Sequence, residues 1–558
     1  MELYFQDRRH GERVTTVTAP VRTGETFEVE IDNLGYRGEG VGRHDGFTVF
    51  VSGALPGERV RVRAGRVARS HAFAHLLDVV CTSPDRVAAP CPVFGACGGC
   101  QLQHISYDGQ LAFKRRQLVD ALTRIGRFDS AVVERVVAPA RGMDDPWRYR
   151  NKVSVVAMAR EGRFVAGFME EGTHDPVGVD ECLIRPEAHD RTLGVLLDLV
   201  RDLGIAPYEE RTDTGHVRQI VVRTSSAGDA LVVIEARGAG QVGRNRFSET
   251  AGGANDADAA HGVRRGENAG RRSRGGVNRI GHSGHPNGGL PHGQELARRL
   301  SGRMPAGFRL AGVVAREFTP FTPPQAGAGG SGVRQRSARP GSANAGSARP
   351  GELPETVVER VLWGTPHLHE TFGGMRFRAS AGAFLQVNPA QDDVLYGLAL
   401  DAAQLREDDV VADLYCGVGT LTLMAARHVA AAVGVESVAP AIADARHNAQ
   451  ENRVTNARFL LGRTEDILRD KRLAVPRPTV VLLDPPRAGC GVEVARSIAV
   501  LRPRRVVYIS CNPATLARDL RSLADEGYAL ESAVPVDMFP QTAHVECCSL
   551  LIRKDVTP

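Results

Sequence analysis

The sequence predicts a multidomain α/β protein with an N-terminal OB-like β-barrel, a central α+β domain that carries a cysteine cluster, and a C-terminal Rossmann-like domain. Three observations support this division. Short alternating strand patterns with glycine turns come first, cysteines gather after them, and helix and strand patterns alternate regularly after Glu355. A chain of 558 residues has the length of about three domains. We place them at 23–85, 86–378 and 379–558, after a disordered tail at 1–22.

The composition limits the compartment and the class of partner. A formal net charge of +5 permits a nucleic-acid partner without demonstrating one. No apolar run approaches the ~20 residues that span a bilayer, and the polar N-terminus lacks the apolar region of a signal peptide. We therefore expect a cytoplasmic protein whose ten reduced cysteines are ligands, nucleophiles or packing residues.

The segment 23–85 alternates apolar and polar residues, as Phe27, Val29 and Ile31 illustrate, and glycine turns separate the runs. Small barrels of this kind often bind oligonucleotides. A basic stripe accompanies the strands and consists of Arg59, Arg61, Arg63, Arg66 and Arg69. An RNA-binding face and a merely solvated charged face explain this stripe equally well.

Three cysteines follow the barrel: Cys91, Cys97 and Cys100, spaced C-x5-C-x2-C. This spacing in a reducing compartment indicates a metal site. Cys182 is the natural fourth ligand, because its polar, proline-flanked loop differs from the apolar strand settings of other cysteines, whereas Cys81 stays unassigned. Zinc and an iron–sulfur cluster both accept four thiolates, and spacing alone does not separate them.

The stretch WRYRNK places Arg148, Tyr149, Arg150 and Lys152 side by side. Basic residues with an interleaved aromatic suit phosphate contacts and stacking on an exposed base. The alternative is a strand end with solvated charges. RNA contact is the favoured interpretation.

Two tracts inside the central domain, at about 239–293 and 322–352, are rich in Gly, Arg, Asn and Ser. Neither can bury enough apolar surface to fold alone, so we expect disordered insertions. A plain linker is favoured over a second RNA contact. QELARRL and FRLAGVVAREF, which lie between the tracts, are expected to be a helix and a strand of the central domain.

The C-terminal domain opens with a strand, a glycine-bearing turn and a helix at 410–426. The next strand ends in Glu436, about 20 residues on, where an acid suits ribose hydroxyls. A later strand ends in Asp484, followed by two prolines. An NAD site is the competing interpretation, but the turn lacks the third glycine of that motif. The order of strands and acids resembles class I S-adenosylmethionine-dependent methyltransferases.

Cys511 follows another strand of the same sheet. Ligands of open α/β sheets bind at the carboxyl ends of the strands, so Cys511 should share one edge with Asp413, Glu436 and Asp484. The last strand is expected to run antiparallel, which brings its first residue, Glu546, to that edge, with His544 nearby. A thiolate, a carboxylate and a methyl donor suit one reaction: Cys511 adds to C6 of uracil, C5 is methylated, and Glu546 removes the C5 proton.

The chain resembles the RNA uracil-5-methyltransferase family, on the stretches FLQVNP, DLYCGVGT, LLDPPRAG, ISCNPATLARD and HVE. The resemblance implies a TRAM-like barrel, a [4Fe–4S] cluster rather than zinc, and an RNA substrate, for which we favour 23S rRNA over tRNA. We also expect a monomer without a membrane or obligate protein partner. The base must reach a thiol in a pocket, so the target uridine is expected to be single-stranded or flipped out. The resemblance assigns Cys511 as the nucleophile, Glu546 as the base, and contacts to S-adenosylmethionine to Gln386, Tyr415, Thr420, Glu436 and Asp484. Thr420 stands where several relatives carry asparagine.

Three rivals remain. A cytosine-C5 methyltransferase also needs a cysteine nucleophile, but the sequence shows no clear group to protonate N3. An RNA-binding iron–sulfur scaffold without activity would not need Gln386, Asp484, Cys511 and Glu546. Methylation of an exocyclic amine would use a DPPY-type motif, whereas Arg487 follows the two prolines here.

Overall fold

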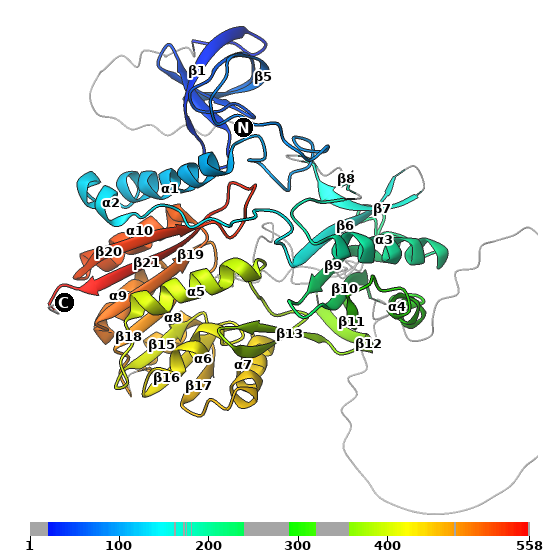
Figure 1. The fold of residues 1–558 in the computed structure, drawn as a ribbon, viewed down its shortest axis with the longest axis vertical. Coiled ribbons are helices and arrows are strands. Elements are labelled where there is room, and N and C mark those ends of the chain that lie inside the picture. Colours follow the sequence, from blue (N-terminus) through cyan, green and yellow to red (C-terminus); the bar gives the residue numbers. More distant parts are fainter. Residues whose placement is uncertain are drawn as a thin grey trace, which may run out of the picture.

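The computed structural model describes residues 20–160, 163–170, 173, 176–179, 181–238, 289–319, 356–473 and 476–555. The predicted tail at 1–22 and the two predicted insertions lie almost entirely outside these residues. Figure 1 shows the barrel above two further bodies, each built around a sheet. No helix of the described part is long and apolar enough to cross a membrane.

The N-terminal body is a closed five-stranded barrel with the order β1-β2-β3-β5-β4, which confirms the predicted OB-like barrel. Alternate residues such as Val29 and Ile31 fill its interior. Gly42 is required by the tight closure, because a Cβ there would lie 2.2 Å from the Glu30 carbonyl oxygen. The strands are β1 (Thr26–Leu34), β2 (Gly40–His44), β3 (Phe47–Val51), β4 (Arg59–Val67) and β5 (His71–Cys81).

The central body is a seven-stranded sheet with the order β12-β11-β10-β9-β6-β7-β8. Its strands are β6 (Lys152–Arg160), β7 (Arg163–Met169), β8 (Pro176–Gly178), β9 (Val217–Thr224), β10 (Asp229–Arg237), β11 (Arg309–Thr319) and β12 (Thr356–Gly364). Helices α3 (Glu187–Asp202) and α4 (Gly293–Ser301) bury Leu196 and Leu300 against one face. Strands β10 and β11, which flank the first predicted insertion, pair in parallel.

The C-terminal body is a seven-stranded sheet with the order β17-β16-β15-β18-β19-β21-β20, in which β21 alone runs antiparallel to the other six strands. This confirms the Rossmann-like domain and its antiparallel last strand. The strands are β15 (Val410–Leu414), β16 (Ala431–Glu436), β17 (Ala457–Leu461), β18 (Val480–Leu483), β19 (Arg505–Ser510), β20 (Tyr528–Val536) and β21 (Glu546–Arg553). The helices are α5 (Pro389–Ala403), α6 (Thr420–Ala426), α7 (Ala439–Glu451), α8 (Thr464–Arg469), α9 (Gly491–Leu501) and α10 (Pro513–Asp525).

The hairpin of β13 (His367–Phe372) and β14 (Met375–Ser380) leads into this domain. It is fixed to α7, since Arg378 pairs with the buried Asp444 at 2.8 Å and Ser380 donates to the same carboxylate. The domain start that we placed at 379 therefore falls inside β14.

Two helices that precede the central sheet in the sequence pack on the C-terminal sheet. In Figure 1, α1 (Tyr107–Arg124) and α2 (Ser130–Val136) lie beside α10 and β20. Leu118, Leu122 and Val133 join the core formed by those elements. The range 86–378 thus contributes to two bodies of the fold.

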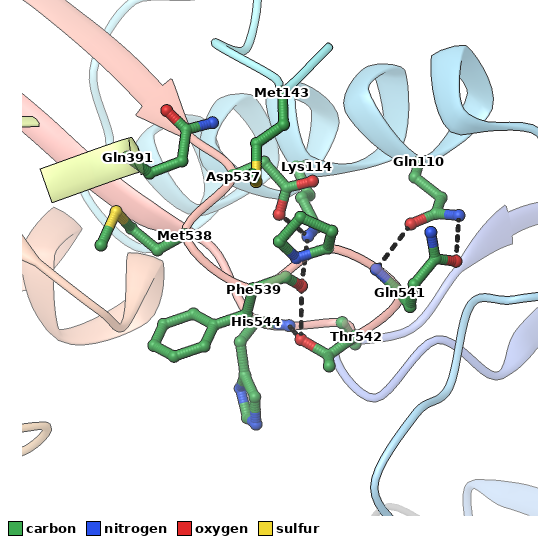
Figure 2. A network of polar contacts seen from close by, with 12 residues as sticks. Gln110, Lys114, Met143, Gln391, Asp537, Met538, Phe539, Gln541, Thr542 and His544 are labelled. Atoms are coloured by element: carbon green, nitrogen blue, oxygen red, sulfur yellow. Dashed lines mark hydrogen bonds and ion pairs between the residues drawn. The ribbon is translucent and has the colours of Figure 1, made fainter. Parts of the chain in front are cut away.

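A fully buried ion pair joins the two parts. Lys114 of α1 pairs with Asp537, which follows β20, and also donates to the Phe539 carbonyl at 3.1 Å (Figure 2). Tyr107 donates to the other oxygen of Asp537 at 3.0 Å. The Lys114 ammonium group and both carboxylate oxygens of Asp537 therefore have hydrogen-bond partners in the interior.

We predict that Lys114→Met destabilises the protein by about 3–5 kcal/mol, because Asp537 is left as a buried, unpaired charge. Urea unfolding followed by tryptophan fluorescence and circular dichroism measures the change. Arg116→Met, which removes an exposed ion pair from the same helix, is the control and should shift stability by less than about 1 kcal/mol. The double change Lys114→Met with Asp537→Leu should recover most of the loss; a loss equal to that of the single variant would contradict the argument.

Candidate active site

The carboxyl ends of the parallel strands form one wall of a cavity of about 860 Å³. All seven residues that we predicted for the cofactor and the chemistry line this cavity. They are Gln386, Tyr415, Thr420, Glu436, Asp484, Cys511 and Glu546. Asp413, at the end of β15, lines it as well. The strand-end rule therefore brings the predicted groups into one site.

The turn after β15 is held in a left-handed conformation. Tyr415 has φ 71° and Gly419 has φ 84°, and a Cβ on Gly419 would lie 2.9 Å from the Phe459 ring. The Glu436 carboxylate accepts hydrogen bonds from the backbone N–H groups of Gly417 at 3.2 Å and Val438 at 2.8 Å. These bonds fix the carboxylate at the cavity wall, where a ribose hydroxyl can reach it.

Two carboxyl groups below this turn have raised pKa values. Asp413 is buried and accepts a hydrogen bond from Thr422 at 2.6 Å, and burial raises its pKa to about 6. Burial and the nearby Asp413 raise the pKa of Asp484 to about 7. Both groups are thus poised to ionise near neutral pH, and a cationic ligand in the cavity would favour their charged forms.

The register of the last strands places Cys511 and Glu546 opposite each other. Ser510 of β19 pairs with Cys547 of the antiparallel β21, so the next residue, Cys511, faces the preceding residue, Glu546. Cys511 is half-buried and stands just before α10, whose first turn is capped by the Asn512 side chain. Glu546 is almost fully buried, with 4% of its surface exposed.

Arg487 is the cation that opposes the raised pKa values of Cys511 and Glu546. Burial and the neighbouring Glu546 raise the pKa of Cys511 to about 11, and Arg487 opposes that rise. Burial and Asp484 also hold the pKa of Glu546 well above its usual range, again opposed by Arg487. Hydrogen bonds from Asn512 at 3.2 Å and Thr515 at 3.1 Å to the Arg487 carbonyl fix this arginine beside the start of α10.

Known proteins match the chain along most of its length. A family model described as tRNA (Uracil-5-)-methyltransferase matches residues 368–554, and the TRAM domain model matches 20–77. An RNA methyltransferase of Halalkalibacterium halodurans is 36% identical over 96% of this chain and 99% of the relative. One from Listeria innocua is 32% identical over 96% of this chain and 99% of the relative. The chain belongs to the RNA uracil-5-methyltransferase family.

A solved structure extends the likeness to the whole fold. The tRNA (uracil-54, C5)-methyltransferase of Pyrococcus abyssi, in complex with S-adenosyl-L-homocysteine, aligns with 94% of this chain and 100% of its own, at a TM-score of 0.61 and 22% identity. The RNA uracil-5-methyltransferase family uses S-adenosylmethionine as its methyl donor, and the barrel is its TRAM domain.

No local sequence pattern predicts that the TRAM barrel lies near the active site. Tyr36 lies on the loop between β1 and β2 and is half exposed. Burial is the main cause of its raised pKa; Arg487 opposes the rise, whereas Cys511 and Glu546 add to it. A cleft of about 990 Å³ runs from Tyr36 between the barrel, α1 and Pro513. Such a contact joins segments far apart in the sequence, so no local pattern signals it.

The four cysteines predicted as ligands interact with one another electrostatically. Burial raises the pKa of Cys100 to about 12, and Cys182, Cys97 and Cys91 add to that rise. The Gly99 N–H donates to the Cys97 sulfur at 3.4 Å, as is common for thiolate ligands. This donor set suits a thiolate-bound group. In the described part of the chain, however, no three His, Cys, Asp or Glu side chains are arranged to hold a metal ion.

The basic group at 148–152 is partly structural. Arg148 donates to the Cys182 carbonyl at 3.1 Å, and the buried Tyr149 donates to the Pro540 carbonyl at 2.9 Å. Burial and the neighbouring Arg223 lower the pKa of Lys152 to about 8. Arg150 donates to the Lys152 carbonyl at 3.1 Å. The Tyr149 ring, expected to stack on a base, lies in the interior of this structure.

We predict that Arg487→Gln slows alkylation of Cys511 by about tenfold, because loss of the cation raises the pKa of the thiol further. With a pKa of about 11 only about one thiol in a thousand is ionised at pH 8, and the rate should rise about tenfold per pH unit. Iodoacetamide labelling between pH 7 and 10, with the modified peptide identified by mass spectrometry, measures the rate, and Cys511→Ser identifies background labelling. Equal alkylation rates in the wild type and Arg487→Gln across this pH range would remove the role of this arginine.

Proposed function

We propose that the enzyme methylates C5 of a uridine in RNA through a covalent adduct between Cys511 and C6. The observation that carries this proposal is the register of β19 and β21, which sets Cys511 opposite Glu546 in the cavity that also holds Glu436 and Asp484. Uracil C5 is a poor nucleophile, so an enzyme must activate it before methylation.

In the proposed reaction, the Cys511 thiolate forms a bond to C6, and the π electron pair of the C5–C6 double bond moves into an enolate whose nucleophilic carbon is C5. S-adenosylmethionine would supply an electrophilic methyl group, which C5 would take up while the bond from that methyl group to sulfur breaks and S-adenosylhomocysteine leaves. Glu546 then removes the C5 proton, the C5–C6 double bond returns, and the bond from C6 to the Cys511 sulfur breaks. Arg487 favours the thiolate at the start and at the end of the cycle.

The proposed contacts to S-adenosylmethionine follow from the placement of the cavity residues. The fixed carboxylate of Glu436 would accept the ribose hydroxyls, while Tyr415 and Thr420 flank the turn that faces the ligand. Asp484, which raises the pKa of both Cys511 and Glu546, and the buried Gln386 line the same cavity and would orient the sulfonium and the uracil.

We propose that Cys91, Cys97, Cys100 and Cys182 hold a [4Fe–4S] cluster. Besides burial, Cys182, Cys97 and Cys91 each add to the raised pKa of Cys100, which supports one shared thiolate-bound group. The family resemblance favours a cluster over zinc. Its distance in sequence from Cys511 favours a role in structure or RNA positioning over redox chemistry. Zinc is the alternative that metal analysis of the purified protein decides.

The RNA is proposed to enter through the cleft between the TRAM barrel and α1. Tyr36 stands where this cleft meets the active site, and Arg43, Arg116 and Arg124 line its walls. Arginines beside an exposed aromatic suit a strand that carries a flipped-out base. Of the basic group near 150, Arg150 and Lys152 stay as proposed RNA contacts on the central domain. We take 23S rRNA as the first substrate to test and tRNA as the alternative.

Methyl transfer from labelled S-adenosylmethionine to size-separated RNA, followed by nucleoside analysis, tests the proposed reaction. We expect 5-methyluridine from the wild type, none from Cys511→Ala, and an RNA adduct resistant to denaturation that accumulates with Glu546→Gln. The labelled RNA fraction identifies 23S rRNA or tRNA. Label in 5-methylcytidine, or product formed by Cys511→Ala, would reject the proposal.

We predict that Tyr36→Ala lowers kcat/KM for RNA by about 5- to 100-fold, since stacking of one base on an aromatic ring contributes ~1–3 kcal/mol. Tyr36→Phe keeps the ring and should retain activity. Steady-state kinetics with unmethylated RNA of the size fraction that accepts the label, together with the affinity for S-adenosylmethionine, measure the effect. Loss of cofactor affinity in Tyr36→Ala would indicate damage to the site instead of lost RNA contact.

A further inference from the structure

The segment 537–545, which we call the base segment, connects β20 to β21 and ends immediately before Glu546. It has no regular secondary structure, yet most of its backbone is held by residues from other parts of the chain. Figure 2 shows Lys114 and Gln110 of α1 reaching this segment. Asn388, at the start of α5, donates to the Met538 carbonyl at 3.1 Å. The position of Glu546 therefore depends on contacts outside its own sheet.

Gln541 is the most constrained residue of the base segment. Its φ of 69° lies in the left-handed region, which a residue with a side chain rarely adopts. Its N–H donates to the Gln110 side chain, and the Gln110 amide donates in return to its side chain, both at 3.0 Å. The carbonyl of Gln541 accepts the N–H groups of Gln101 at 3.1 Å and Leu102 at 3.0 Å. These four bonds maintain a strained backbone in one conformation.

Gln101 directly follows Cys100 of the four-cysteine site. Its side chain donates to the carbonyl of Gly98, between Cys97 and Cys100, at 2.8 Å. The oxygen of the same side chain accepts the N–H of Ala543 at 3.4 Å, three residues before Glu546. One amide group thus bridges the cysteine loop and the base segment.

Tyr149 forms a second bridge. Its hydroxyl donates to the Pro540 carbonyl at 2.9 Å, inside the protein. The backbone N–H groups of Arg148 and Arg150, on either side of Tyr149, donate to the carbonyls of Leu183 at 2.9 Å and Ile184 at 2.8 Å, directly after Cys182. The neighbouring Arg148 ties its own side chain to the carbonyl of Cys182 at 3.1 Å.

We infer that Gln101 and Tyr149 are positioning residues that link the four-cysteine site to the catalytic base. In this arrangement the group bound by the cysteines holds the cysteine loop in one conformation. The hydrogen bonds of Gln101 and Tyr149 then hold the base segment, and with it Glu546, in position. The four-cysteine site then supports proton abstraction by Glu546 through structure alone and exchanges no electrons with the substrate. This inference rests on the proposed function, since it assigns Glu546 the proton-abstracting step.

The decisive experiment separates adduct formation from adduct resolution. We expect Gln101→Leu and Tyr149→Phe to lower kcat by about 10- to 100-fold with little change in KM, because a base displaced by about 1 Å resolves the adduct slowly. The denaturation-resistant RNA adduct should accumulate in both variants, as in Glu546→Gln. A variant that is merely misfolded would form less adduct. Gln219→Leu, which removes a hydrogen bond to Ser154 in the central sheet, is the matched control and should behave as the wild type.

Hydrogen exchange gives a readout that does not depend on activity. Peptides covering 537–545 should exchange about tenfold faster in Gln101→Leu than in the wild type, while peptides of the TRAM barrel stay unchanged. The ratio of iron to protein should stay the same in the two proteins, which would show that the bridge and not the bound group was lost. Wild-type exchange and wild-type adduct levels in both bridge variants would overturn the inference. If the wild type forms no 5-methyluridine and Glu546→Gln no adduct, the proposed function fails instead.

Discussion

The antiparallel pairing of β19 with β21 is the constraint on which the active site depends. Parallel strands alone would deliver Asp413, Glu436, Asp484 and Cys511 to one edge of the sheet, which suffices for a cofactor and a nucleophile. The proposed base, in contrast, must come from a strand that begins at this edge. The reversed β21 begins there with Glu546, and the Ser510–Cys547 register sets it opposite Cys511. A slip of one residue would turn Glu546 to the other face of the sheet.

The same reversal creates a need for outside support. A parallel strand returns through a helix, but β20 and β21 are joined by an irregular segment whose polar backbone is buried. Buried backbone groups require partners. The partners come from α1, the cysteine loop, Tyr149 and Asn388, so the N-terminal half of the chain completes the catalytic domain. This explains why α1 and α2 pack on the C-terminal sheet, although they precede the central one.

Much of this organisation could be predicted from the sequence, and the remainder shares one physical cause. Strand periodicity and strand-end residues are local signals, and they located the barrel, the Rossmann-like sheet and the strand-end residues of the cavity. Gln386, Tyr415 and Thr420 follow from the family resemblance. The amphipathic pattern of α1 shows that one face is buried but not which sheet covers it. Tyr149 stands between basic residues, as is typical of an RNA contact, yet its ring is buried and its hydroxyl donates to the base segment. Arg487, Tyr36 and Gln101 matter through contacts between distant segments, which no sequence window contains.

In the proposed reaction, the electrostatics of Cys511 and Glu546 are a compromise between two steps. Burial makes Glu546 a stronger base, because a raised pKa means that its carboxylate binds a proton more tightly. The same environment makes the thiolate of Cys511 rare but more nucleophilic once formed. A charged Glu546 would repel that thiolate, whereas a protonated one could not take the C5 proton. Arg487, which opposes both pKa rises, lowers the free energy of the state in which both groups are charged. The reaction must pass through that state whenever the adduct forms with the base ready to act.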